Sequence, residues 1–140
     1  MKVIVLLPDS SAWIELLRDT GSAVHRRLRD ALEDEEPVGV TEPVVMEVLS
    51  GATSQEHANA LRRQLIGFQL LSVGGLAGFD HAAAIYRTCR EAGESLRGTI
   101  DCLIAVAAIR GEAALLHADR NFDAIARHTD LRIEPVEPAR

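Results

Sequence analysis

Four acidic residues stand where a carboxylate could do chemistry. Asp9 and Asp119 each come shortly after an apolar run that predicts a buried strand. Glu47 and Asp101 each interrupt an otherwise apolar stretch, VVMEVL and TIDCLIAVAA. A carboxylate in such surroundings is unfavourable unless it is hydrogen-bonded, paired or bound to a cation. We therefore expect each of these four acids to have a hydrogen-bonding partner, an ion-pair partner or a bound cation.

Taken one at a time, each acid has an ordinary structural explanation, as a helix cap, a partner of a helix dipole or a solvated edge position. Taken together, they predict a different kind of site. Two carboxylates ~4 Å apart repel each other by about 4 kcal/mol at an effective dielectric constant of ~20. A cluster of four would need a cation, and ligands made only of oxygen favour Mg²⁺ or Mn²⁺. Such an ion polarises a phosphoryl oxygen and activates water, which is hydrolytic phosphodiesterase chemistry.

The elements that must position these acids alternate between strand and helix along the chain. We expect strands at residues 3–7, 38–40, 70–73, 115–116 and 132–136, with helices between them. The expected helix N-caps are Ser10 with Ser11, Thr41, Ser54, Asp80 and Thr99. This alternation predicts an α/β fold, a single three-layer α/β/α domain over residues 1–140 with a small parallel sheet flanked by helices. Ligands of such sheets bind beyond the carboxyl ends of the strands, where Asp9 and Asp119 are expected.

Composition excludes several classes of protein. The 140 residues carry 15 basic and 21 acidic side chains, a net charge of −6, which argues against nucleic-acid binding through general charge. Any nucleic-acid role would need local basic residues or a metal ion. The two cysteines argue against a disulfide scaffold and a cysteine-rich zinc site. No apolar run approaches the ~20 residues that span a bilayer, so we expect a soluble, cytoplasmic protein with no membrane partner.

The stretches that hold the four acids resemble the ordered motifs of PIN-domain proteins, and most of all the VapC-type toxins of type II toxin–antitoxin systems. VIVLLPDSSAWIELLR resembles the first motif and EPVVMEVLSGA the second. GTIDCLIAVAAI resembles the third and LLHADRNFDAIA the fourth. The order and spacing match over nearly the full length of the chain.

The resemblance implies a Mg²⁺- or Mn²⁺-dependent endoribonuclease that hydrolyses RNA phosphodiester bonds. Asp9, Glu47, Asp101 and Asp119 would take the family's acidic positions. Asp9 and Asp101 would be direct metal ligands, and the other two would complete the shell, bind a second ion or orient the water. Ser11 stands where the family often has a hydroxyl near the metal. The resemblance also implies a homodimer and a VapB-like antitoxin that covers the acids.

The fourth motif departs from the family pattern at two positions. His117 stands where threonine or serine is common, and Asn121 where a further acid is common. His117 is either a hydrogen-bond partner of the site or a partly buried histidine at a strand end. Glu42 competes with Glu47 for the acidic role, but its place at a helix entrance is explained by the helix dipole alone.

Three arginines, Arg87, Arg90 and Arg97, could meet RNA phosphates or form a plain solvated helix face. Two rival functions stay open at this point. One is a non-catalytic PIN-like module that binds RNA or protein. The other is a phosphotransfer domain with Asp9 as nucleophile, which Ser11 disfavours because phosphatases of that type carry a second aspartate there.

Overall fold

The computed structural model describes residues 3–136 of the chain, so the two ends of the expected 1–140 domain lie outside the described residues. Within that range the strands are β1 (Leu6–Pro8), β2 (Gly39–Val40), β3 (Gln69–Leu70), β4 (Ala114–Leu116) and β5 (Arg132–Ile133). All their pairings are parallel. One sheet has the order β1-β4-β5, and β2 pairs with β3. A parallel bridge between Leu6 and Val38 brings the two sheets together beside β1.

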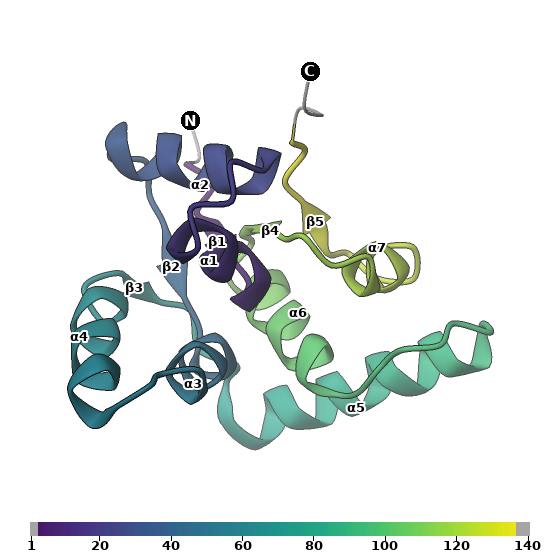
Figure 1. Cartoon of the computed structure of the whole chain (residues 1–140). Helices are drawn as coiled ribbons and strands as arrows, with labels where there is room; N and C mark the ends of the chain where they lie inside the picture. The colour runs from purple at the N-terminus through teal and green to yellow at the C-terminus, as the bar shows by residue number, and fades with distance from the viewer. Residues whose placement is uncertain (1–2, 137–140) are drawn as a thin grey trace.

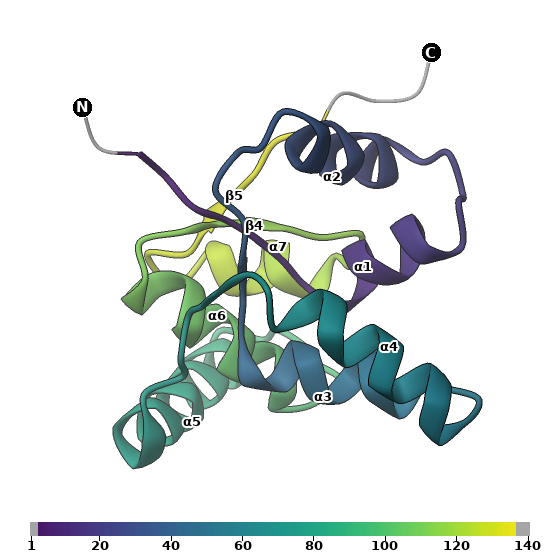
Figure 2. The ribbon, with the colours of Figure 1, turned by 90° about the vertical axis from the view of Figure 1, so that its left-hand side faces the viewer.

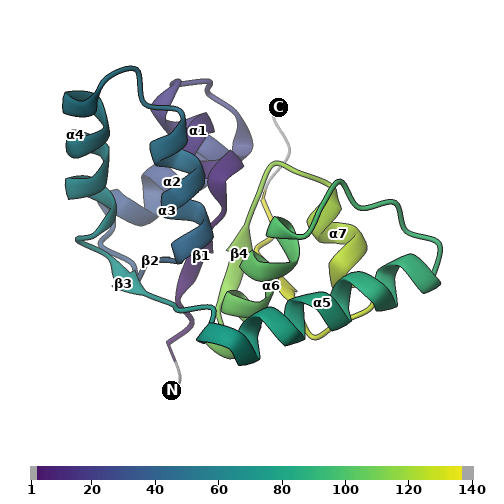
Figure 3. The same cartoon turned by 90° about the horizontal axis from the view of Figure 1, so that it is seen from below.

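Helices fill the connections between the strands (Figure 1). They are α1 (Ser10–Leu17), α2 (Ala23–Glu33), α3 (Glu42–Ser50), α4 (Gln55–Leu65), α5 (Gly75–Glu91), α6 (Ile100–Arg110) and α7 (Asn121–Ala126). Helix α2 lies on one side of the strands, and α5 and α6 lie on the other (Figure 2). From below, α5 and α6 run side by side and α3 packs beside α4 (Figure 3). The predicted α/β fold with a small parallel sheet flanked by helices is confirmed.

Helix α6 is the centre of the core. Its residues from Cys102 to Ala108 are all buried, as a helix that is apolar on nearly every side requires. Leu7, Leu115 and Phe122 are fully buried beside it. Asp101 therefore stands on the first turn of a helix whose position is fixed by the core.

Four strands are shorter than predicted, whereas β4 includes Ala114 in addition to the predicted residues 115–116. β1 begins at Leu6 because its pairing with β4 and the bridge to Val38 both begin there. Val3 is 71% exposed, so the first apolar residues of the expected strand at 3–7 lie outside the sheet. The last strand pairs only at 132–133 rather than over 132–136.

Ser54 caps α4 as predicted, whereas the other four expected N-caps differ from the structure in position or in side-chain bonding. Asp9, not Ser10 or Ser11, caps α1 with its side chain. Thr41 and Thr99 stand at cap positions without a side-chain cap hydrogen bond. Helix α5 begins at Gly75 rather than at Asp80, because Gly74 and Gly75 adopt φ of 86° and 62°, which suits glycine and turns the chain into the helix earlier.

Within residues 3–136, none of the helices has the length and apolar character needed to cross a membrane.

Candidate active site

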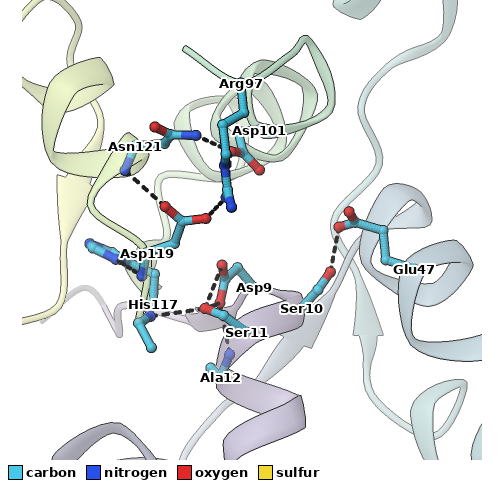
Figure 4. Close-up of polar contacts among 11 residues, drawn as sticks. Asp9, Ser10, Ser11, Ala12, Glu47, Arg97, Asp101, His117, Asp119 and Asn121 are labelled. Carbon is cyan, nitrogen blue, oxygen red and sulfur yellow. Dashed lines mark hydrogen bonds and ion pairs between the residues drawn. The ribbon is translucent and has the colours of Figure 1, made fainter. Parts of the chain in front are cut away.

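Two of the four acids reach one edge of the sheet from neighbouring strands. β1 and β4 pair in parallel, with Pro8 opposite Leu116, so their carboxyl ends coincide. The Asp9 backbone N–H donates to the Leu116 carbonyl at 2.9 Å, and Asp119 follows three residues later. Figure 4 shows the carboxylates of Asp9, Asp101 and Asp119 directed toward a common space. The sequence-predicted edge of the sheet is where these side chains lie.

Asp9 is the most buried of these acids, with 3% of its surface exposed. Its Oδ1 accepts the Ala12 N–H at 2.9 Å, and the Ser11 hydroxyl lies 2.7 Å from Oδ1 and 2.9 Å from Oδ2. Burial raises the pKa of Asp9 from 3.8 to about 6, although these hydrogen bonds act to lower it, and the charge of Asp101 raises it further. At neutral pH, Asp9 is therefore a buried carboxylate that a nearby cation would stabilise.

Ser11 connects the two strand ends. Its hydroxyl donates to Asp9 and accepts the Ala118 N–H at 2.9 Å. The predicted supporting hydroxyl thus orients the Asp9 carboxylate and fixes the segment that carries Asp119.

Asn121 lies between two of the acids. Its side-chain Nδ2 donates to Asp101 Oδ2 at 3.1 Å, and its backbone N–H donates to Asp119 Oδ1 at 3.0 Å. The amide that replaces the family's further acid therefore holds Asp101 and Asp119 in place.

Arg97 supplies a positive charge to the same pair of acids. Its guanidinium forms an ion pair with Asp119 and lies 3.7 Å from Asp101 Oδ2. In Figure 4 it lies in the space between these carboxylates, above Asp9. The Arg97 side chain is 70% exposed, so it reaches the site from the solvent side.

His117 orients the backbone of the fourth motif. Its Nδ1 accepts the Asp119 N–H at 3.0 Å, which leaves the proton of a neutral ring on Nε2, 3.3 Å from Asp123 Oδ1. Burial lowers the pKa of His117, against the opposing effect of Asp123, and favours this neutral form. The centroid of the His117 ring lies 5.4 Å from the centroid of the Phe122 ring. His117 is therefore a half-buried histidine at the end of β4 whose ring hydrogen-bonds the backbone that carries Asp119.

Glu47 reaches the site from α3. Its Oε1 accepts the Ser10 hydroxyl at 2.5 Å. Glu47, Arg97 and Asp101 line one open hollow of about 350 Å³. Glu47 is thus set apart from the three other acids but faces the same hollow as Asp101.

Glu42 is used elsewhere. Its two oxygens accept the Val73 N–H at 2.9 Å and the Ser72 hydroxyl at 2.8 Å. Burial acts to raise the pKa of Glu42, but the hydrogen bonds outweigh it and hold the pKa below its usual range. This carboxylate joins the start of α3 to the segment after β3. Glu42 therefore bonds the backbone there, whereas Glu47 faces the hollow beside Asp101.

The chemistry of these side chains fits a hard divalent ion. The donors are carboxylate oxygens, and Asp9 is buried with its pKa raised. Within residues 3–136, no three His, Cys, Asp or Glu side chains are grouped closely enough to hold an ion as they stand. Hydrogen bonds from Ser11 and Asn121 and the guanidinium of Arg97 now take the oxygens that an ion would use. The sequence analysis missed this position of Arg97, because Arg97 lies in the segment between α5 and α6 and its contact with Asp119 depends on the fold.

These features define an α/β protein with an acidic site at the carboxyl edge of its parallel strands. The PIN domain family matches residues 6–128, and the chain therefore belongs to the PIN-domain family.

Named relatives agree with this assignment. The chain is 43% identical over 129 residues to ribonuclease VapC11 of Mycobacterium tuberculosis, covering 91% of this chain and 96% of the relative. Two solved structures share the fold. VapBC2 from Rickettsia felis, bound to a DNA fragment from its promoter, has a TM-score of 0.71 at 14% identity over 94% of this chain and 98% of that one. VapBC-1 from nontypeable Haemophilus influenzae has a TM-score of 0.69 at 20% identity over 94% and 97%.

Proposed function

We propose that this protein is a Mg²⁺- or Mn²⁺-dependent endoribonuclease toxin that a VapB-like antitoxin neutralises. The observation that carries the proposal is the buried Asp9 carboxylate, whose pKa burial raises, beside the carboxylates of Asp101 and Asp119. The name of VapC11 as a ribonuclease supports the reaction. The VapBC complexes among proteins of the same fold support the partner.

In this proposal Asp9 and Asp101 hold the ion, and Glu47 and Asp119 complete the shell or orient the water. A divalent ion supplies Lewis-acid activation of the phosphate and lowers the pKa of a bound water. The other side chains position these acids. Ser11 orients Asp9, Asn121 joins Asp101 to Asp119, and His117 fixes the Asp119 backbone.

The net charge of −6 is consistent with a site that meets RNA through metal ions rather than through a basic surface. The same acidic surface would attract basic groups of an antitoxin. A homodimer, a cytoplasmic location and a single domain over residues 1–140 belong to the same proposal.

Cleavage of a labelled RNA by the purified chain tests the reaction. After treatment with EDTA we expect no cleavage, and Mn²⁺ or Mg²⁺ restores it. Asp9→Asn and Asp101→Asn should each lower the rate by at least about 100-fold, because they remove charges that would hold the ion. Asp80→Asn, an exposed acid of α5, is the matched control and should keep the wild-type rate.

RNA that is bound but never cut with either ion would favour the non-catalytic alternative. Equal cleavage by wild type and Asp101→Asn would place the activity outside this site. Expression in a bacterial host tests the partner. We expect growth arrest, relief by a short antitoxin encoded beside the gene, and no arrest with Asp101→Ala.

A further inference from the structure

Arg97 is an exposed residue whose guanidinium contacts two acids of the candidate site. The side chain is 70% exposed, yet its guanidinium lies against the carboxylates of Asp101 and Asp119 rather than in solvent. It belongs to the segment between α5 and α6, four residues before Asp101.

The contact of Arg97 with Asp101 and Asp119 places a positive charge among negative ones. The carboxylates of Asp9, Asp101 and Asp119 are directed toward a common space, so their negative charges repel one another. A positive group between Asp101 and Asp119 offsets repulsion that the folded chain would otherwise carry. The guanidinium therefore lies beside the carboxylate oxygens of Asp101 and Asp119 that the proposed divalent ion would bind.

Asp101 Oδ2 lies near two side chains that differ in charge. Asp101 Oδ2 faces both Asn121 Nδ2 at 3.1 Å and Arg97 at 3.7 Å, while Asp119 is paired with Arg97. Asn121 is neutral and can stay beside a carboxylate that binds an ion. Arg97 is positively charged, so a divalent ion bound to the same carboxylates would repel its guanidinium.

We propose that Arg97 is a built-in counter-cation that holds Asp101 and Asp119 in the metal-free protein and must leave them before a divalent ion binds. This inference rests on the metal site of the proposed function and adds its regulation. Arg97 then sets the concentration of Mn²⁺ or Mg²⁺ at which the site fills. Its high exposure lets the side chain move into solvent without disturbing the core.

The experiment measures Mn²⁺ binding directly, by isothermal titration calorimetry on the EDTA-treated and dialysed full chain. We compare wild type with Arg97→Ala, Arg97→Lys and Arg87→Ala, the last being an exposed arginine of α5 that controls for the loss of one positive charge. Arg97→Ala should bind Mn²⁺ at least about threefold more tightly than Arg87→Ala, in keeping with the removal of an exposed ion pair. Arg97→Lys, which keeps the charge but cannot span two carboxylates, should fall between Arg97→Ala and wild type.

Thermal unfolding without metal provides a second measurement. Arg97→Ala should unfold at a lower temperature than Arg87→Ala, because its carboxylates lose their counter-cation, and saturating Mn²⁺ should remove the difference. Equal Mn²⁺ affinities in Arg97→Ala and Arg87→Ala, or weaker binding in Arg97→Ala, would overturn the inference while leaving the proposed ribonuclease intact. Wild type that binds no Mn²⁺ would overturn the inference and the metal-dependent function together.

Discussion

Replacing Asp9 by asparagine should stabilise the metal-free protein at neutral and alkaline pH. Burial raises the pKa of this carboxyl from 3.8 to about 6, so the folded state disfavours its charged form. A group with a raised acid pKa contributes stability that is complete below its unfolded pKa and is lost as the pH rises through its folded pKa. The cost of the charge is therefore small near pH 4 and complete near pH 8.

The magnitude follows from the difference between the two pKa values, 3.8 and about 6. At about 1.4 kcal/mol for each pH unit, the charged form costs about 3 kcal/mol of folding free energy at pH 8. Asparagine keeps an Oδ1 that can accept the Ala12 N–H and the Ser11 hydroxyl, but it gives up one acceptor, at a cost of about 1 kcal/mol. We expect Asp9→Asn to gain about 2 kcal/mol over wild type at pH 8.

Urea unfolding in EDTA at a series of pH values between 4 and 8 measures this effect. The advantage of Asp9→Asn should grow with pH and should be absent at the acid end. Asp80→Asn, at an exposed position, serves as the control and should follow wild type throughout. Mn²⁺ at about 100 times its Kd should then raise the stability of wild type by about 2.7 kcal/mol and leave Asp9→Asn unchanged. An Asp9→Asn protein that is less stable than wild type at pH 8 in EDTA, or a difference that does not vary with pH, would refute the reasoning.

Three further predictions test other parts of the structure. Glu42→Ala should lose about 1–2 kcal/mol of stability in urea unfolding, because the Val73 N–H loses its acceptor. Since the pKa of Glu42 is lowered in the folded protein, this loss of stability should shrink as the pH falls through that pKa. A loss that grows in acid would contradict the role of Glu42. His117→Phe keeps the ring packing but leaves the Asp119 N–H without its acceptor, so RNA cleavage should fall by about tenfold or more, and an unchanged rate would remove His117 from the site. Gly78→Ala should destabilise the protein by about 3 kcal/mol, because the added Cβ would lie 1.6 Å from the Val73 carbonyl oxygen, and wild-type stability would show that α5 can shift at no cost.

The sequence predicted the architecture because alternation of apolar strands and amphipathic helices is a local pattern. The sequence analysis also expected all four acids to converge in one pocket, but only Asp9, Asp101 and Asp119 are directed toward a common space, and Glu47 lies apart from them. Asp9 and Asp119 follow strands that pair in parallel, and Asp101 opens the most buried helix of the chain. These placements needed only the rule that parallel strands end at one edge of the sheet.

Other features depended on contacts between distant residues and were not predictable from local patterns. The task of Glu42 is set by the backbone of Val73, 31 residues away. Arg97 was expected either to meet RNA phosphates or to lie on a solvated helix face, and its contact with Asp119 depends on the fold. The start of α5 was misplaced because Asp80 resembles a cap, whereas the left-handed backbone at Gly74 decides where the helix begins.

The hydrogen bond between the Ser11 hydroxyl and the Ala118 N–H joins groups separated by 107 positions in the chain. During synthesis, the first of these groups leaves the ribosome long before the second exists. The nascent chain can build helices α1 to α5 and still lack half of its acidic pocket. The acidic site is therefore complete only when nearly the whole polypeptide has been made, and a truncated product that ends before β4 would lack Asp119 and Asn121.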